Sequence, residues 1–379
     1  TDQTTSYGSG AINAVDQSYL RIEDFTFRGG RGRTVIFMWA SNYRSVAPYV
    51  VGIEIINNTF DDNGYDAAGT GNSAAVVQLD ALGREDGYTG SAPLNIITGN
   101  TFTNNFGMQI HLQSRASDFR IANNTITGVK GSSESSLGYN FAGHGVSFSG
   151  PRNIIENNTF ANWTNNPGPN LDYAGVRCDV GRNSPGNIIR NNEIHDILYG
   201  MTSDTFVYGI LLEASCGGGI LVQNNIIYNI GYSCITIGDA AVTVSDTGTI
   251  DGNVWYQCKR GGLSLNNAVN FTVKNNIFAE NASRDGAQVL VADDSINVGN
   301  TFRNNLYYKS GTTLIGKWGG SGIALPAADL TLSQWNSTSG DTGSKSADPL
   351  FVDPAGGNFH LQSFSPACGA GEGGVDMGT

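Results

Sequence analysis

The sequence predicts an all-β solenoid, a parallel β-helix, and three observations carry that prediction. The first is a period: the Asn pairs at Asn123, Asn157, Asn191 and Asn224 are spaced by 34, 34 and 33 residues, and a period of 20–50 residues is typical of solenoids. The second is that each repeat contains short apolar strands and no 3.6-residue helical periodicity. The third is a recurring motif, "NIIENNTFANW" at Asn153, with close copies beginning at Glu54, Arg120, Ile188, Leu221 and Thr272.

Each repeat is expected to contain a strand before the Asn pair, one after it, and a third such as 145–149, 175–179 or 209–213. Asn tolerates the left-handed conformation of a sharp bend, and its amide can donate to one coil while accepting from another. We therefore expect an internal Asn ladder with one member of each pair at 123/124, 157/158, 191/192 and 224/225. Such a ladder would also keep the N-x-T sequons at Asn57, Asn123 and Asn157 out of reach of glycosylation.

Composition restricts the class of protein. The chain has 379 residues, 14% of them charged, and a formal net charge of −12, which argues against a nucleic-acid partner because phosphate contacts need clustered cations. No apolar run approaches the ~20 residues of a membrane helix. We expect a soluble, secreted chain whose native N-terminus is incomplete. Of five cysteines, Cys178 is expected to be a buried thiol, whereas Cys216 and Cys234 could pair.

The repeats resemble the right-handed parallel β-helix superfamily, which contains pectate lyases, polygalacturonases, chondroitinase-type lyases, alginate lyases and phage tailspikes. The run 330–371, with "DPLFVDP" and "GNFHLQSFSPACGAG", is similar to the closing segment of many secreted bacterial members. The resemblance implies a right-handed helix of about a dozen coils that acts on polysaccharides. We expect the β-helix over residues 1–310 and the last coils with a cap, built around Trp318, Trp335 and Phe359, over 311–379 of the same domain.

The candidate active site lies on the outer face of one sheet. Period-two alternation directs Val146, Phe148 and their equivalents inward, and places the intervening side chains outside. Coils lie ~4.8 Å apart, so Asp179 and Glu213 are expected to be neighbours in one column, beside Arg177 and two coils from His111. Two carboxyl groups ~5 Å apart fit a retaining glycoside hydrolase, in which one is the acid and the other the nucleophile. Hydrolysis of a polysaccharide without a cofactor is the first functional prediction.

Other residues are expected to bind the substrate. Polar side chains near the same columns offer hydrogen bonds, and aromatic rings expected in flanking loops offer faces for sugar stacking. His144 lies in a Gly-His-Gly stretch similar to that of polygalacturonases, whose other catalytic elements have no counterpart here. The expected substrate-binding residues are Asp80, Gln113, Arg115, His144, Trp163, Tyr173 and Tyr208.

Two alternatives remain open. A polysaccharide lyase would neutralise a uronate carboxylate and remove the neighbouring proton, with Arg177, Arg115 or His111 as neutraliser or base. In a Ca²⁺-dependent lyase Asp179 and Glu213 would be metal ligands. The second alternative is a non-catalytic carbohydrate-binding or fibre protein, which would have no converging titratable groups on the outer face.

Overall fold

The structure is a computed structural model. It describes residues 10–30, 34–39, 50–63, 75–80, 95–113, 116–130, 143–163, 172–179, 184–198, 206–213, 216, 218–238, 247–281, 287–292, 297–319 and 329–378.

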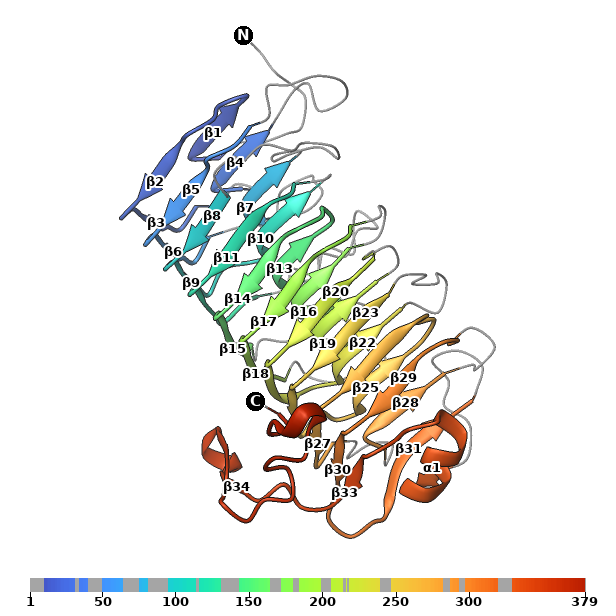
Figure 1. The fold of residues 1–379 in the computed structure, drawn as a ribbon. Helices are drawn as coiled ribbons and strands as arrows, with labels where there is room; N and C mark the ends of the chain where they lie inside the picture. Colours follow the sequence, from blue (N-terminus) through green and yellow to red (C-terminus); the bar gives the residue numbers. More distant parts are fainter. Residues whose placement is uncertain are drawn as a thin grey trace, which may run out of the picture. The chain divides into compact units, whose positions relative to one another are not determined.

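The chain forms two compact units, each a stack of coils. The first comprises Thr1–Cys178 with Leu198–Phe206, and the second comprises Asp179–Ile197 with Val207–Thr379. In both units the described coils contribute strands in turn to three sheets, here named A, B and C, and the strands of a sheet follow one another in chain order (Figure 1). The predicted single-stranded, right-handed parallel β-helix is thereby confirmed.

In the first unit, sheet A contains β1 (Ile12–Val15), β4 (Ile36–Trp39), β7 (Ala75–Asp80), β10 (Met108–Gln113), β13 (His144–Phe148) and β16 (Asp172–Cys178). Sheet B contains β2 (Arg21–Glu23), β5 (Glu54–Ile56), β8 (Asn95–Thr98), β11 (Phe119–Ala122) and β14 (Ile154–Glu156). Sheet C contains β3 (Thr26–Arg28), β6 (Thr59–Asp61), β9 (Thr101–Thr103), β12 (Thr125–Thr127) and β15 (Thr159–Trp163).

In the second unit, sheet A contains β19 (Phe206–Leu212, from Val207 onward), β22 (Ser233–Ile237), β25 (Gly261–Leu265), β28 (Val289–Val291), β31 (Leu314–Trp318) and the antiparallel β32 (Asp329–Thr331). Sheet B contains β17 (Ile188–Arg190), β20 (Ile220–Gln223), β23 (Gly248–Asp251), β26 (Phe271–Lys274) and β29 (Thr301–Arg303). Sheet C contains β18 (Glu193–Ile197), β21 (Ile226–Ile230), β24 (Val254–Tyr256), β27 (Ile277–Ala279), β30 (Leu306–Tyr308) and β33 (Lys345–Ser346).

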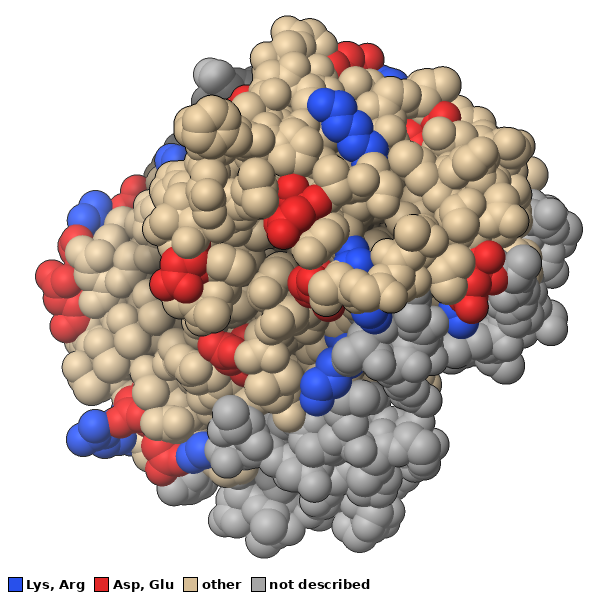
Figure 2. Space-filling view, turned by 90° about the horizontal axis from the view of Figure 1, so that it is seen from below, with Lys and Arg blue, Asp and Glu red and all other residues tan. Residues whose placement is uncertain are grey.

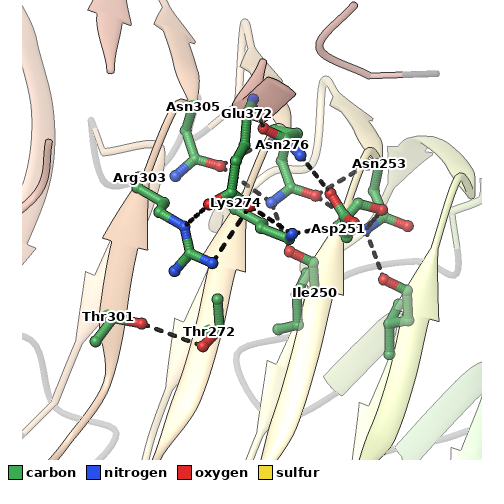
Figure 3. Close-up of polar contacts among 12 residues, drawn as sticks. Ile250, Asp251, Asn253, Thr272, Lys274, Asn276, Thr301, Arg303, Asn305 and Glu372 are labelled. Carbon is green, nitrogen blue, oxygen red and sulfur yellow. Dashed lines mark hydrogen bonds and ion pairs between the residues drawn. The ribbon is translucent and has the colours of Figure 1, made fainter. Parts of the chain in front are cut away.

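The two Asn residues of each pair divide the two expected roles between them. The first is exposed and left-handed, as at Asn123 (φ 55°), and makes the bend between sheets B and C. The second is buried and forms the ladder: the backbone N–H and the side-chain amide of Asn124 each donate to Oδ1 of Asn158 over 2.9 Å. The same contacts join Asn100 to Asn124 in the first unit. In the second unit they run through Asn192, Asn225, Asn253, Asn276 and Asn305, the last three of which are drawn in Figure 3.

This division corrects one expectation. The sequon residues Asn57, Asn123 and Asn157 are exposed, so the ladder does not keep them out of reach of glycosylation. It also explains two segments that resemble the motif but have Gly-Asn in place of the Asn pair, at 99–100 and 252–253. Gly99 and Gly252 stand where other coils have the first Asn, and both have positive φ (68° and 66°), which glycine adopts without a steric cost.

Replacing a ladder Asn is expected to destabilise the fold. Asn124→Leu leaves the backbone N–H of Asn100 buried without its acceptor, and such a loss costs about 1–3 kcal/mol. The side-chain amide of Asn100 also loses one of its three acceptors. Asn123→Gly is the matched control, because Gly keeps the left-handed bend and the residue is exposed. Urea unfolding of the two variants measures the difference, and equal stability of both would contradict the ladder's role.

The interior of each unit is filled by stacked apolar side chains. The inward residues expected from alternation, among them Val146, Phe148, Ile210 and Leu212, are fully buried. Aromatic rings stack from coil to coil, as Phe60 does on Phe102, with 4.7 Å between the ring centroids. Cys178 is fully buried, as expected, but is disulfide-bonded rather than a free thiol. The expected pair was wrong, because Cys234 pairs with Cys258, and Cys216 is disulfide-bonded to another residue.

The C-terminal segment does two different things in the second unit. Helix α1 (Leu332–Ser339) buries Trp335 against the end of the interior, as expected of a cap. Phe359 does not join it. The hairpin of β34 (Phe351–Asp353) and β35 (Asn358–Leu361) packs instead on the outer face of sheet C, where Phe359 contacts Tyr228 and Tyr256.

Beyond the hairpin, Glu372 lies on sheet B. Its carboxylate accepts from Lys274 (2.7 Å) and Arg303 (2.9 Å), as Figure 3 shows. These two cations lower the pKa of Glu372 to about 2. Elsewhere on the surface, acidic and basic side chains are interspersed, as on the face in Figure 2. In the described part of the chain, no helix has the length and apolar character needed to span a membrane.

Candidate active site

Two columns of side chains mark the outer face of sheet A in the first unit. The register of β7, β10, β13 and β16, adjacent in Figure 1, aligns Gln78 with His111, His111 with Ser147, and Ser147 with Arg177. We call this the inner column. The outer column aligns Trp39 with Asp80 and Asp80 with Gln113. The expected separation of His111 and Arg177 by two coils is therefore correct.

Arg177 reaches back from the inner column to a second histidine. Its Nη1 lies 3.0 Å from Nε2 of His144, which is three residues before Ser147 on β13. An arginine side chain has donors only, so Nε2 of His144 accepts this hydrogen bond. The imidazole is therefore neutral and carries its proton on Nδ1.

The surroundings of His144 enforce the same state. Its side chain is fully buried, and burial, followed by the charge of Arg177 and by His111, holds its pKa well below the usual range. Desolvation and a neighbouring cation both disfavour an imidazolium. His144 thus serves as a fixed neutral acceptor that orients the half-buried guanidinium of Arg177.

Two further groups of the cluster are polar and nearly covered. His111 retains 5% of its surface exposed, and Ser147, between His111 and Arg177 in the column, is fully buried. The Ser147 hydroxyl has no hydrogen-bond partner among the described residues. Buried hydroxyl groups are normally hydrogen-bonded, so Ser147 is an exception among the described residues. On the same outer face of sheet A, the Gln78 side-chain amide donates to Oε1 of Gln113 over 2.7 Å.

The predicted carboxylate pair lies in the second unit. Asp179 follows β16 and is partly exposed, whereas Glu213 follows β19 and is 5% exposed. Their closeness to each other and to Arg177 stays a prediction. Among the residues with described placement, no group of three or more His, Cys, Asp or Glu side chains is arranged to hold a metal ion.

The expected aromatic sugar-binding residues are placed differently. Trp163 and Tyr173 are fully buried, and Tyr208 is nearly so, with its ring edge-on to Tyr232. The reason is that they belong to strands β15, β16 and β19 rather than to loops. As placed, they cannot stack on a sugar. Arg115 lies outside the described residues.

The buried His144 predicts a pH dependence of stability. The folded-state pKa lies below the unfolded value of about 6.5, so the unfolded chain binds more protons as the pH falls through 6.5. The stability that neutral His144 contributes is therefore complete above this pH and decreases below it, by up to about 1.4 kcal/mol per pH unit. Urea unfolding at pH 7, 6 and 5 should show a shallower slope for His144→Gln, which does not titrate. Parallel slopes would contradict the assignment.

Comparison with known proteins agrees with the fold. A profile of the family described as "Right handed beta helix region" matches residues 34–247. The match covers more than half of the chain, so the chain belongs to this family. The family includes carbohydrate-active enzymes as well as proteins that are not enzymes.

A more particular likeness is to "Uncharacterized protein YwoF" of Bacillus subtilis (strain 168). The two are 28% identical over 187 residues, which is 47% of this chain. The chain covers 37% of that relative's length.

Two features of the site were missed by sequence reasoning. The contact between His144 and Arg177 is diagonal across the strands, and column alignment alone does not show it. Trp39 was also overlooked, although "IFMW" ends one residue beyond an inward position, as "VQLD" does on the next strand of the same sheet. Aligning the coil that contains β4 with the later ones would have found Trp39.

Proposed function

We propose that the chain is a secreted carbohydrate-active enzyme that cleaves a uronate-containing polysaccharide by elimination. The observation that carries the proposal is the Arg177 guanidinium held at 3.0 Å by neutral His144, in the same column as His111. Elimination requires charge neutralisation at the carboxylate, for which the fixed Arg177 is suited, and a base for the adjacent carbon, for which we propose His111 of the same column.

Each group has a stated role. Arg177 binds the uronate carboxylate and stabilises the negative charge that develops when the neighbouring C–H bond breaks. His111 accepts that proton. The electron pair forms a double bond to the next ring carbon, and the bond from that carbon to the glycosidic oxygen breaks. The leaving oxygen then takes the proton from the His111 imidazolium, so His111 ends neutral. His144 is a positioning residue that acts through Arg177.

Hydrolysis by Asp179 and Glu213 is the second candidate. Its one structural support is the burial of the Glu213 side chain, because a hydrolase needs a carboxyl group held in a sheltered position. It does not account for the Arg177–His144 contact in the first unit. We therefore rank elimination first.

The test is a panel of neutral and uronate polysaccharides assayed for two products at once. Elimination produces new reducing ends together with the ultraviolet absorbance of an unsaturated uronate. Reducing ends without absorbance would overturn elimination in favour of hydrolysis. Binding without new reducing ends on any uronate polymer would overturn catalysis and favour the binding protein.

A further inference from the structure

The outer column contains an indole that the reaction does not use. Trp39 ends β4 and retains 38% of its side-chain surface exposed, whereas Trp163, Trp255 and Trp335 are fully buried. A single exposed aromatic residue is common on protein surfaces. The position of Trp39 is what distinguishes it, because its strand register places it directly beside Asp80 and, one coil further, Gln113.

The outer column is continuous with the proposed reaction site. Asp80 and Gln113 are each two residues beyond Gln78 and His111 of the inner column on the same strands, and alternation puts all four on one face. The bond between Gln78 and Gln113 ties the two columns together. From β4 to β16 there are four strand spacings, about 19 Å in total. A polymer bound at Arg177 that runs along the sheet reaches Trp39 several sugar residues away.

The outer face of sheet A has a different chemistry near Trp39 on β4 from that near Arg177 on β16. A flat indole face suits the apolar face of a sugar ring, and the Asp80 carboxylate accepts hydrogen bonds from hydroxyl groups. The described members of the outer column, Val15, Trp39, Asp80 and Gln113, include no cation. The indole face of Trp39 offers no positive charge to a second uronate, so an uncharged sugar is favoured.

We propose that Trp39 is the platform of a distal subsite for an uncharged sugar, so that the substrate is a copolymer of uronate and neutral sugars. The inference rests on the proposed function for the identity of the reacting sugar. Binding at Trp39 can be measured without turnover, so the subsite and the proposed elimination can be tested separately.

Affinity electrophoresis in gels that contain a glucuronate–glucose copolymer tests binding directly. Trp39→Ala is expected to weaken retention about tenfold, whereas Trp39→Phe retains part of it because a ring face remains. Phe364→Ala, which removes an 89% exposed aromatic residue of the C-terminal segment, is the control and should migrate like the parent. Equal retention of Trp39→Ala and the parent would overturn the subsite.

The sugar preference has its own readout. Retention on polygalacturonate, a uronate homopolymer, should depend less on Trp39 than retention on the copolymer. An equal loss on both polymers would overturn the assignment to an uncharged sugar. If Trp39→Ala weakens binding while no polymer is cleaved by the parent, the subsite stands and the proposed elimination fails. If the parent cleaves a polymer by elimination and Trp39→Ala binds normally, the proposed elimination stands and the subsite fails.

Discussion

Arg177→Ala is expected to lower kcat/KM on the cleaved uronate polymer about 100- to 1,000-fold, the usual cost of removing one preorganised charge-stabilising donor. The reason is that Arg177 is held by His144 before substrate binds, so its loss removes both the charge and its fixed geometry. Arg177→Lys keeps the charge without the planar fork, and should lie between the parent and Ala. Steady-state kinetics on the uronate polymer measure the effect.

The controls separate this effect from damage to the fold. Arg120→Gln removes an arginine that is paired with Glu156 on sheet B of the same unit, and should leave kcat/KM within a few-fold of the parent. His144→Gln preserves an acceptor for Arg177 and is expected to retain more activity than His144→Leu, which does not. An Arg177→Ala enzyme with near-normal kcat/KM would place the reaction elsewhere, with Asp179 and Glu213 the next residues to test.

Trp335→Ala is expected to cost about 3–5 kcal/mol of unfolding free energy, the range for removing a buried tryptophan. Trp335 is fully buried and contacts one aromatic residue from each sheet of the second unit: Phe302 of B, Tyr307 of C and Trp318 of A. Its Nε1 also donates to Asp341 over 3.0 Å. The side chain therefore closes the end of the interior, and removing it exposes all three sheets there.

Urea unfolding measures this loss, and two variants of the same helix calibrate it. Trp335→Phe keeps a ring but loses the Asp341 hydrogen bond, and should cost less than Ala. Ser333→Ala changes an exposed residue and should be nearly neutral. Hydrogen exchange should speed up first in β29, β30 and β31. A loss below 1 kcal/mol for Trp335→Ala would show that the helix is not the cap.

The fold could be predicted because its determinants are local and repeated. The Asn pairs return at nearly constant spacing, and alternation correctly directed Val146, Phe148 and their equivalents inward. Which Asn of each pair forms the bend and which forms the ladder was not predictable from residue type, since both are Asn and either could take either position. It is fixed by register, which only the stacked coils define.

The site was predictable only in part. The column that holds His111 and Arg177 could be predicted, because aligned strands of neighbouring coils pair residue by residue in parallel register. The reach of a long side chain is not contained in that alignment, so the bond from Arg177 to His144 was missed. Trp163 and Tyr173 were assigned to loops because their strands run further than the repeat suggests. Once in strands, large aromatic side chains gain most by burial.

Cleavage in water enriched in ¹⁸O, with immediate reduction of the products, tests elimination most directly. Elimination breaks the bond on the uronate side of the glycosidic oxygen without adding water. Mass spectrometry should therefore find unsaturated products that carry no ¹⁸O from the cleavage step. Hydrolysis adds one water per bond broken. Saturated products with one ¹⁸O for each cleavage would contradict the role assigned to Arg177 and His111.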